Sequence, residues 1–279
     1  MMMKAVGFPN IKKMLWQWLL VLLLGGMVLG ASPARAAELL VSAAASLSDA
    51  FVELGILFEQ ENPGVKVIGN FASSGALYRQ LEQGAPADVF ASANPRWMEE
   101  AIRRELVRRQ DSANFVANEL VLAVAARGRV VAVAGLHDLK SPALTRVGIG
   151  TPETVPAGRY AKDALEAAGL WRELSGKMIF GENVRQVLDY LRRGEVDAGF
   201  IYATDAAKGG AAVRVVETMT WTEPPVYPIA PLVNSRQPEL ARRFVELTMT
   251  ERGASILARH GFTPIRWQDH PSKVTLPES

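Results

Sequence analysis

The segment LLVSAAASLSDAFVELGILF, residues 39–58, joins an apolar run to an amphipathic helical pattern through a turn of small and hydroxyl-bearing residues. Three further segments repeat this design, at residues 65–83, 147–169 and 178–194. A helix start exposes unpaired N–H groups and carries about half a positive charge. Several such starts directed at one point form a receptor for a small anion.

Short apolar runs alternate with helical patterns along most of the chain. The runs predicted as strands lie at residues 39–43, 65–71, 88–91, 120–125, 146–150, 177–180, 198–202, 213–216 and 226–233. Between them, apolar residues recur at helical spacing, as at Phe51, Leu54 and Phe58. Glycines follow three of the helical patterns, at Gly84, Gly169 and Gly194. The alternation predicts an α/β fold with mainly parallel sheets.

Two segments are predicted to cross between two lobes. Residues 119–125 leave the first half of the chain and residues 227–233 return to it, so that the helix at 238–250 completes the first lobe. We therefore expect lobe 1 to comprise residues 37–119 plus 230–279, and lobe 2 to comprise residues 120–229. A single-sheet domain is the alternative. About 243 residues are enough for two lobes with separate cores.

The first 36 residues have the pattern of a cleavable signal peptide. Lys4, Lys12 and Lys13 precede an apolar stretch at residues 15–29, and Ala34-Arg35-Ala36 follows it. The stretch is short for a membrane span, and the small-x-small triplet is what signal peptidase accepts. We expect cleavage after Ala36, with an uncleaved membrane anchor as the alternative.

Cleavage would change the charge balance. The full chain has a formal net charge of +2, whereas the chain after Ala36 has 27 basic and 29 acidic residues, a net charge of −2. No basic footprint for nucleic acid remains. The chain contains no cysteine, which excludes a disulfide, a thiolate metal site and a lipid-modified N-terminal cysteine. We expect a periplasmic monomer that is not a lipoprotein.

Two candidate contact residues come from the first half of the chain. Ser46 follows the small residues 42–45, where the backbone can pass close to a ligand, and Ser74 opens a helical pattern. Each serine offers a hydroxyl group, and Gly75 offers only its backbone. The alternative is ordinary helix capping, with Ser46 and Asp49 as a capping box and Ser74 as an N-cap.

Three more candidates come from the second half. Pro156 favours the first position of a helix, which leaves the N–H of Ala157 in the first turn behind a small methyl group. Asn183 is a candidate cap, so that Val184 becomes a first-turn donor. Tyr202 lies at the carboxyl end of an apolar strand, where ligands bind in open α/β sheets. Plain helix starts and a buried structural tyrosine are the alternatives.

Five motifs, in this order along the chain, resemble the periplasmic molybdate-binding proteins of ABC transporters. They lie at residues 43–47, 71–74, 84–90, 152–160 and 201–205, and the resemblance extends over residues 39–264. It implies a two-lobed periplasmic-binding-protein fold of type II, in which each lobe is a mainly parallel sheet flanked by helices and the ligand lies in the interlobe cleft. The ligand contacts that it implies are Ser46, Ser74, Ala157, Val184 and Tyr202. Gly75 departs from the pattern, since some members have a serine there.

The function implied by this resemblance is capture of molybdate, and of tungstate, for an inner-membrane ABC permease. The five contact residues are uncharged, which suits a tetrahedral dianion that only accepts hydrogen bonds. Molybdenum would be bound only as the oxyanion, with no cofactor and no catalytic residue. Arg159 and Arg185 are expected outside the contact set. Selectivity against the smaller sulfate would be steric, and phosphate usually carries a proton that needs an acceptor.

Two other classes of function stay open at this point. The same fold could bind another oxyanion such as sulfate, or a metal chelate. An envelope hydrolase would need a base beside a serine, but His137, His260 and His270 accompany no serine-elbow pattern. No two histidines have the spacing of metal ligands.

Overall fold

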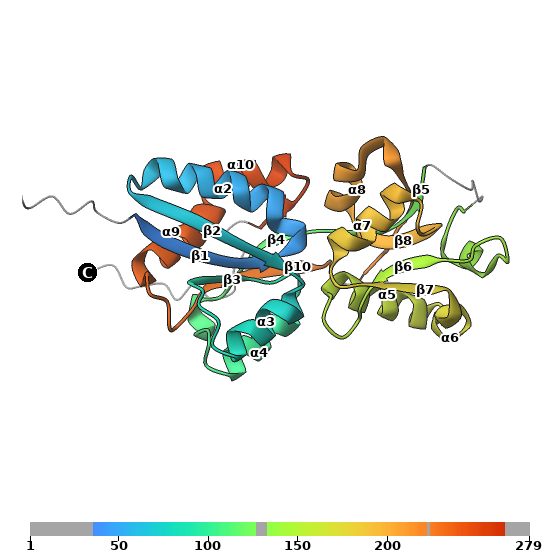
Figure 1. The fold of residues 1–279 in the computed structure, drawn as a ribbon, viewed down its shortest axis with the longest axis horizontal. Coiled ribbons are helices and arrows are strands. Elements are labelled where there is room, and N and C mark those ends of the chain that lie inside the picture. Colours follow the sequence, from blue (N-terminus) through green and yellow to red (C-terminus); the bar gives the residue numbers. More distant parts are fainter. Residues whose placement is uncertain (1–35, 127–132, 222–223, 266–279) are drawn as a thin grey trace, which may run out of the picture. The chain divides into compact units, whose positions relative to one another are not determined.

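The computed structural model describes residues 36–126, 133–221 and 224–265 and contains two β-sheets flanked by helices (Figure 1). The predicted signal peptide, apart from Ala36, lies outside the described residues, as do His270 and the C-terminal stretch after Trp267. None of the helices in the described ranges has the length and apolar character needed to cross a membrane.

The first sheet has six strands in the order β11-β4-β10-β3-β1-β2. These strands are β1 (Ala37–Ala44), β2 (Val65–Ala72), β3 (Val89–Ala91), β4 (Ala113–Ala117), β10 (Val226–Pro231) and β11 (Thr263–Pro264). β1 pairs in parallel with β2 and β3, whereas β10 is antiparallel to β3 and β4. All of β10 belongs to this sheet, so the lobe limit expected between residues 229 and 230 falls inside the strand.

The second sheet has five strands in the order β7-β6-β8-β5-β9. They are β5 (Leu120–Ala125), β6 (Val147–Gly150), β7 (Met178–Gly181), β8 (Ala198–Tyr202) and β9 (Val213–Thr218). β6 is parallel to β7 and β8, and β5 is antiparallel to β8 and β9.

Both sheets are therefore mixed, which corrects the expectation of mainly parallel sheets. The parallel pairs are those joined through helices, as the geometry of a parallel crossover requires. The two strands that connect the sheets, β5 and β10, pair antiparallel with their neighbours. An alternation of helices and strands predicts the parallel pairs but not the antiparallel pairs of β5 and β10.

Helices cover both faces of each sheet (Figure 1). Their bounds are α2 (Ser48–Glu61), α3 (Ser74–Glu82), α4 (Pro95–Arg103), α5 (Pro156–Ala167), α6 (Trp171–Leu174), α7 (Val184–Arg193), α8 (Ala203–Gly209), α9 (Pro238–Met249) and α10 (Glu251–Arg259). On the first sheet α2, α9 and α10 pack together on one face, and α3 and α4 on the other. On the second, α5 and α6 lie opposite α7 and α8.

Aromatic packing anchors the helices of the first sheet. The ring of Phe244 on α9 contacts Phe51 and Phe58 on α2, with centroid separations of 5.8 and 5.4 Å. On the opposite face, Leu77 and Trp97 belong to a second buried cluster between α3 and α4. Each aromatic ring pair, such as Phe244 with Phe51, adds about 0.5–1.5 kcal/mol beyond the burial of its area. The strand ends and helix starts near residue 46 and residue 74 are thus held by packed helices.

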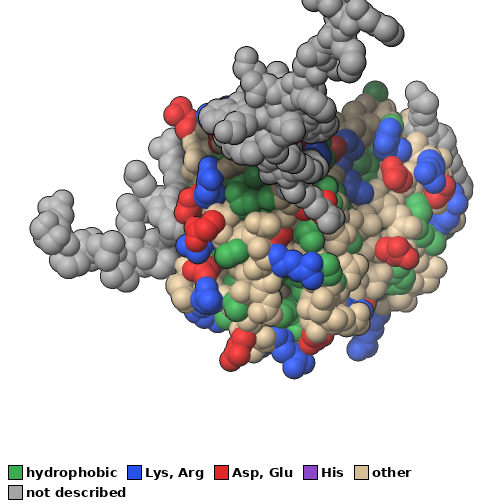
Figure 2. Space-filling model, turned by 60° about the vertical axis from the view of Figure 1, so that its left-hand side comes forward, with side chains coloured by type: hydrophobic (Ala, Val, Ile, Leu, Met, Phe, Trp, Pro, Cys, Tyr) green, Lys and Arg blue, Asp and Glu red, His purple; other side chains and the backbone are tan. Residues whose placement is uncertain are grey.

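The surface mixes both signs of charge. On the face shown in Figure 2, Lys and Arg side chains are interspersed with Asp and Glu, and exposed hydrophobic side chains form small groups. This pattern is typical of a surface without a large field of one sign.

Candidate functional site

All five residues predicted as ligand contacts line one cavity. Its walls are formed by Ala44, Ala45, Ser46, Ala72, Ser73, Ser74, Ala93, Val155, Pro156, Ala157, Asn183, Val184 and Tyr202. The first seven come from segments next to the first sheet, and the rest come from segments of the second. None of these lining residues carries a formal charge. The cavity volume of about 10 Å³ is roughly that of one water site.

Ser46 lies in a short 3-10 turn between β1 and α2. The turn covers Ala45–Leu47, and the N-cap of α2 is Leu47, with no side-chain capping bond. The capping-box alternative for Ser46 is therefore wrong. Its hydroxyl instead lies 3.1 Å from the hydroxyl of Tyr227 on β10, and both groups are buried. The Ser46 side chain is thus held from behind the cavity and is free of helix capping.

Ser74 is the first residue of α3 and is fully buried. The N-cap is Ser73, which makes no side-chain capping bond, so the capping alternative for Ser74 is also wrong. The Ser74 Oγ atom accepts a hydrogen bond of 2.9 Å from the backbone N–H of Ala93. Because a backbone N–H can only donate, the hydroxyl hydrogen of Ser74 is left for another acceptor.

Gly75 is a point of close approach between segments of the two sheets. Its N–H donates to the carbonyl oxygen of Thr154 at 2.9 Å. A Cβ atom at position 75 would lie 2.7 Å from that oxygen and 2.6 Å from the Trp97 ring. The departure from a serine at this position therefore has a steric reason in this chain, because a side chain would displace the Thr154 loop.

Ala157 and Val184 both lie at helix starts. Pro156 is the first residue of α5, which makes Ala157 the second. Asn183 caps α7 by accepting from the N–H of Gln186 at 3.1 Å, which confirms the predicted cap and makes Val184 the first helical residue. N–H groups at these positions have no carbonyl partner within their own helix, and each start brings a partial positive charge to the cavity.

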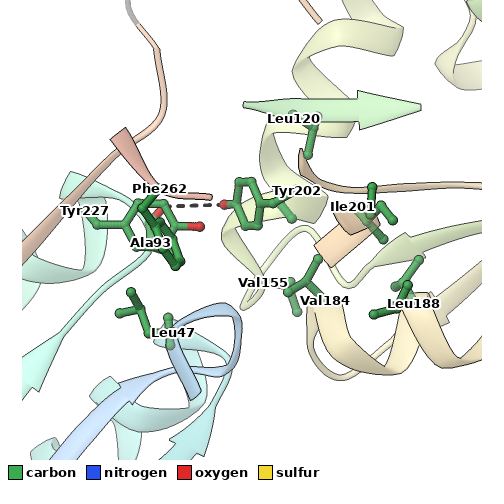
Figure 3. Close-up of a cluster of buried hydrophobic side chains, with 14 of the residues drawn as sticks. Leu47, Ala93, Leu120, Val155, Val184, Leu188, Ile201, Tyr202, Tyr227 and Phe262 are labelled. Atoms are coloured by element: carbon green, nitrogen blue, oxygen red, sulfur yellow. Dashed lines mark hydrogen bonds between the residues drawn. The ribbon is translucent and has the colours of Figure 1, made fainter. Parts of the chain in front are cut away.

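Tyr202 is the last residue of β8 and is 1% exposed. Its hydroxyl points from the second sheet toward the first, where it lies 3.4 Å from the carbonyl oxygen of Ala93 (Figure 3). Burial raises the pKa of Tyr202 well above its ordinary value. The hydroxyl therefore stays protonated and remains a donor at the cavity wall.

Two buried residues behind the cavity carried no signal in the sequence. Asn118 stands between β4 and β5, and its Nδ2 donates to the hydroxyl of Thr204 at 3.0 Å and to that of Tyr227 at 3.2 Å. Tyr227 in turn contacts Ser46. Neither residue belongs to a helix start or a local motif. Only the packing of distant segments brings them behind the site.

The nearby cations lie outside the cavity. Arg185 Nη2 lies 2.9 Å from Asp49 Oδ2 and donates to the carbonyl oxygen of Ser46 at 3.1 Å. Arg159 pairs with Asp163 at 2.9 Å on the exposed side of α5. Neither arginine lines the cavity.

His260 and Ser46 line a common surface pocket, but among the described residues no histidine is hydrogen-bonded to Ser46 or Ser74. His137 is exposed in the 3-10 turn Leu136–Lys140, and His260 contacts Glu53 at 2.9 Å. Within residues 36–126, 133–221 and 224–265, no group of three His, Cys, Asp or Glu side chains could hold a metal ion. The hydroxyls of Ser46 and Ser74 are bonded to Tyr227 and Ala93 instead.

Comparison with known proteins places this geometry in a family. The chain is 35% identical over 247 residues to the molybdate-binding protein ModA of Escherichia coli, covering 85% of this chain and 93% of that protein. It is 33% identical over 242 residues to ModA of Haemophilus influenzae, with coverages of 84% and 93%. The periplasmic molybdate-binding protein of Azotobacter vinelandii shares the fold, with a TM-score of 0.70 and 21% identity over 81% of this chain and 98% of that one. The family model for bacterial extracellular solute-binding proteins matches residues 39–263, and the chain belongs to that family.

Proposed function

We propose that this protein binds molybdate, and tungstate in the same way, and delivers it to the membrane permease of an ABC transporter. The observation that carries the proposal is the single cavity lined by Ser46, Ser74, Ala157, Val184 and Tyr202. The similarity to the molybdate-binding proteins of two other bacteria supports the choice of anion.

The donors around the cavity match the chemistry of the anion. Molybdate and tungstate are tetrahedral dianions with four acceptor oxygens and no proton at neutral pH. Serine and tyrosine hydroxyls and the N–H groups of helix starts offer hydrogen-bond donors without a formal charge. A site that relied on arginine or lysine would leave a desolvated charge unpaired after release of the anion. Neutral, fixed donors avoid that cost.

Selectivity against sulfate would follow from the length of the bonds. Sulfate has the same charge and shape with shorter bonds, so in a rigid cavity it could not reach every donor at once. Each donor left unpaired in a dry site costs about 1–3 kcal/mol. Losing two or three would lower the affinity by orders of magnitude. Tungstate is nearly the size of molybdate and should bind alike.

Delivery would depend on closure of two lobes, one built around each sheet, with all of β10 in the first lobe. An anion held by Ser46 and Ser74 from one side and by Ala157, Val184 and Tyr202 from the other would favour the closed state. The permease would recognise that state. We further propose that residues 1–36 are a signal peptide and that the mature protein acts in the periplasm as a monomer, without a cofactor and without catalytic activity.

The melting temperature of the mature protein tests the proposal. A ligand at a hundredfold its Kd adds about 2.7 kcal/mol to the free energy of unfolding, which gives an easily measured shift. Molybdate and tungstate should raise Tm strongly, and sulfate and phosphate should raise it little. An equal response to sulfate would favour the sulfate alternative. Hydrolysis of a generic ester that is lost in Ser46→Ala would favour the envelope hydrolase.

A further inference from the structure

We infer that Asn118 and Tyr227 are positioning residues that direct the hydroxyl hydrogen of Ser46 into the cavity, so that the site accepts only oxyanions that carry no proton. The inference rests on the proposed function and extends it to two residues outside the cavity wall. The network comprises four buried residues from separate parts of the chain: Ser46, Asn118, Thr204 and Tyr227.

The backbone sets the orientation of the Asn118 amide. The N–H of Glu119 donates to Asn118 Oδ1 at 2.9 Å. A backbone N–H cannot accept a hydrogen bond, so the amide oxygen must face Glu119 and the NH2 group must face the other way. Its two hydrogens then go to the hydroxyls of Thr204 and Tyr227, at 3.0 and 3.2 Å. Both donors of the amide are used, and neither can be exchanged for the oxygen.

This orientation determines the role of Tyr227. The side chain is fully buried, and burial raises its pKa, so the phenol keeps its hydrogen. Its oxygen already accepts from Asn118, and the hydroxyl of Ser46 lies 3.1 Å away. The hydroxyl of Tyr202 is directed at the carbonyl oxygen of Ala93. Tyr202 is the donor in that bond, so its oxygen is a second acceptor within reach of Tyr227. The inference gives the hydrogen of Tyr227 to Ser46 Oγ, and the double-mutant cycle below distinguishes the two acceptors.

Ser46 is then left with one hydrogen to donate, and it lines the cavity together with Ser74. Ser74 is held in the same way, except that its oxygen accepts directly from a backbone N–H, that of Ala93. Both serine oxygens thus receive a hydrogen bond from behind and present their own hydrogen in front. The cavity wall then offers donors from both serines.

A wall of donors discriminates by protonation state. A bare dianion can accept from every group, whereas the hydrogen of monohydrogen phosphate would face another hydrogen. The serine hydroxyl could otherwise rotate and accept that hydrogen, as an unrestrained hydroxyl does. Asn118 and Tyr227 remove this freedom at Ser46. The geometry therefore adds a chemical criterion to the steric one.

The first test compares Tyr227→Phe with the wild-type protein by calorimetry, using molybdate and monohydrogen phosphate at about pH 8. Loss of the directing hydroxyl should weaken molybdate about tenfold and leave phosphate unchanged or tighter, so the affinity ratio of the two anions falls. Tyr78→Phe removes a hydroxyl that contacts Glu82 on α3 and should leave both affinities unchanged. An equal loss for both anions would indicate a purely structural role and overturn the inference.

A double-mutant cycle identifies the partner of Tyr227. If Tyr227 acts through Ser46, the Tyr227→Phe effect on molybdate should disappear in a Ser46→Ala background. If Tyr227 gave its hydrogen to Tyr202 instead, the effect would persist with Ser46→Ala and disappear with Tyr202→Phe. That second result would overturn the inference.

The sharpest test reverses the direction of the hydrogen bonds that run from Asn118 through Tyr227 to Ser46. In Asn118→Asp at about pH 8, the buried carboxylate can only accept, so Tyr227 would turn its hydrogen to position 118 and Ser46 would turn its hydrogen to Tyr227. The Ser46 oxygen would then face the anion, and molybdate should bind at least about a hundredfold more weakly.

Adding Tyr227→Phe to Asn118→Asp removes the reversed hydrogen bonds and should restore part of the affinity for molybdate, about fivefold or more. A direct repulsion between the new carboxylate and molybdate would not be relieved in this way, and no recovery would overturn the inference. If Asn118→Asp does not fold, the ratio of the molybdate and phosphate affinities of Tyr227→Phe still tests the inference. A wild-type protein that does not bind molybdate would instead refute the proposed function.

Discussion

The Nε atom of Arg185 lies 2.8 Å from the Oδ1 atom of Asp205, whose side chain is fully buried. The same guanidinium group reaches Asp49 at the start of α2 and the carbonyl oxygen of Ser46. Because Arg185 follows Val184 on α7, this ionic cluster connects two of the segments that line the cavity. Arg185 thus lies outside the cavity, and its contacts with Asp49 and the Ser46 carbonyl oxygen link α7 to the segment that carries Ser46.

Replacing Arg185 by methionine should destabilise the fold. The carboxylate of Asp205 would stay buried without its cation, and breaking such a buried pair costs about 3–5 kcal/mol. Urea denaturation measures the free energy of unfolding. Arg159→Met is the matched control, since its pair with Asp163 is exposed and is worth about 0.5 kcal/mol. Similar losses for both variants would contradict the role assigned to the cluster.

The stability of the protein should also depend on Asp205 through pH. Burial raises the pKa of Asp205 to about 6, with Arg185 acting in the opposite direction. Between the unfolded value near 4 and this value, the folded state holds a proton that the unfolded state has lost. The contribution of Asp205 is therefore present at low pH and falls, by on the order of 2 kcal/mol, as pH rises from about 4 to about 6.

Comparison with Asp205→Asn isolates this effect. Asp49 and Asp197 have lowered pKa values and act in the opposite sense, but they are present in both proteins. As pH rises from about 4 to about 6, the unfolding free energy of the wild type should fall relative to that of Asp205→Asn. A difference that grows in favour of the wild type would mean that Arg185 lowers the pKa of Asp205 below its ordinary value.

Tyr202→Phe should weaken molybdate by about 1–3 kcal/mol, the range for an anion oxygen deprived of its donor. The ring contact with Tyr227, 5.6 Å between centroids, is retained in the variant, so its stability should change little. Calorimetric titration gives the affinity. Tyr190→Phe, on α7 outside the cavity lining, serves as the control. An affinity equal to the wild type would remove Tyr202 from the site.

Gly75→Ser should lower the affinity for molybdate about tenfold. The new Cβ atom would lie 2.7 Å from the carbonyl oxygen of Thr154, so the loop before α5 would be pushed away from α3. The two parts of the cavity wall would then no longer close together. Gly176→Ser is a suitable control, since nothing lies within 4 Å of its Cβ position. Binding of molybdate as tight as in the wild type would show that this contact does not matter.

Much of the local structure could be read from the sequence. The cap at Asn183 and the left-handed glycines at helix ends, Gly84, Gly169 and Gly194, are where the sequence predicts them. The sequence does not predict the strand β4, because Ala113–Ala117 contains no long apolar run. The local sequence also allows Ser46 as a helix cap, yet its hydroxyl bonds to Tyr227, which is 181 residues away.

The sequence by itself determined which residues open helices and end strands, because capping, proline placement and apolar periodicity act over a few neighbouring residues. From these local signals it identified five of the residues that line one cavity. Only the tertiary structure decided the antiparallel pairing of β5 and β10, the close approach of Gly75 to Thr154, and the network of Asn118 and Tyr227. These contacts join segments distant in the chain, and the packing of helices and sheets, rather than any local pattern, brings them together.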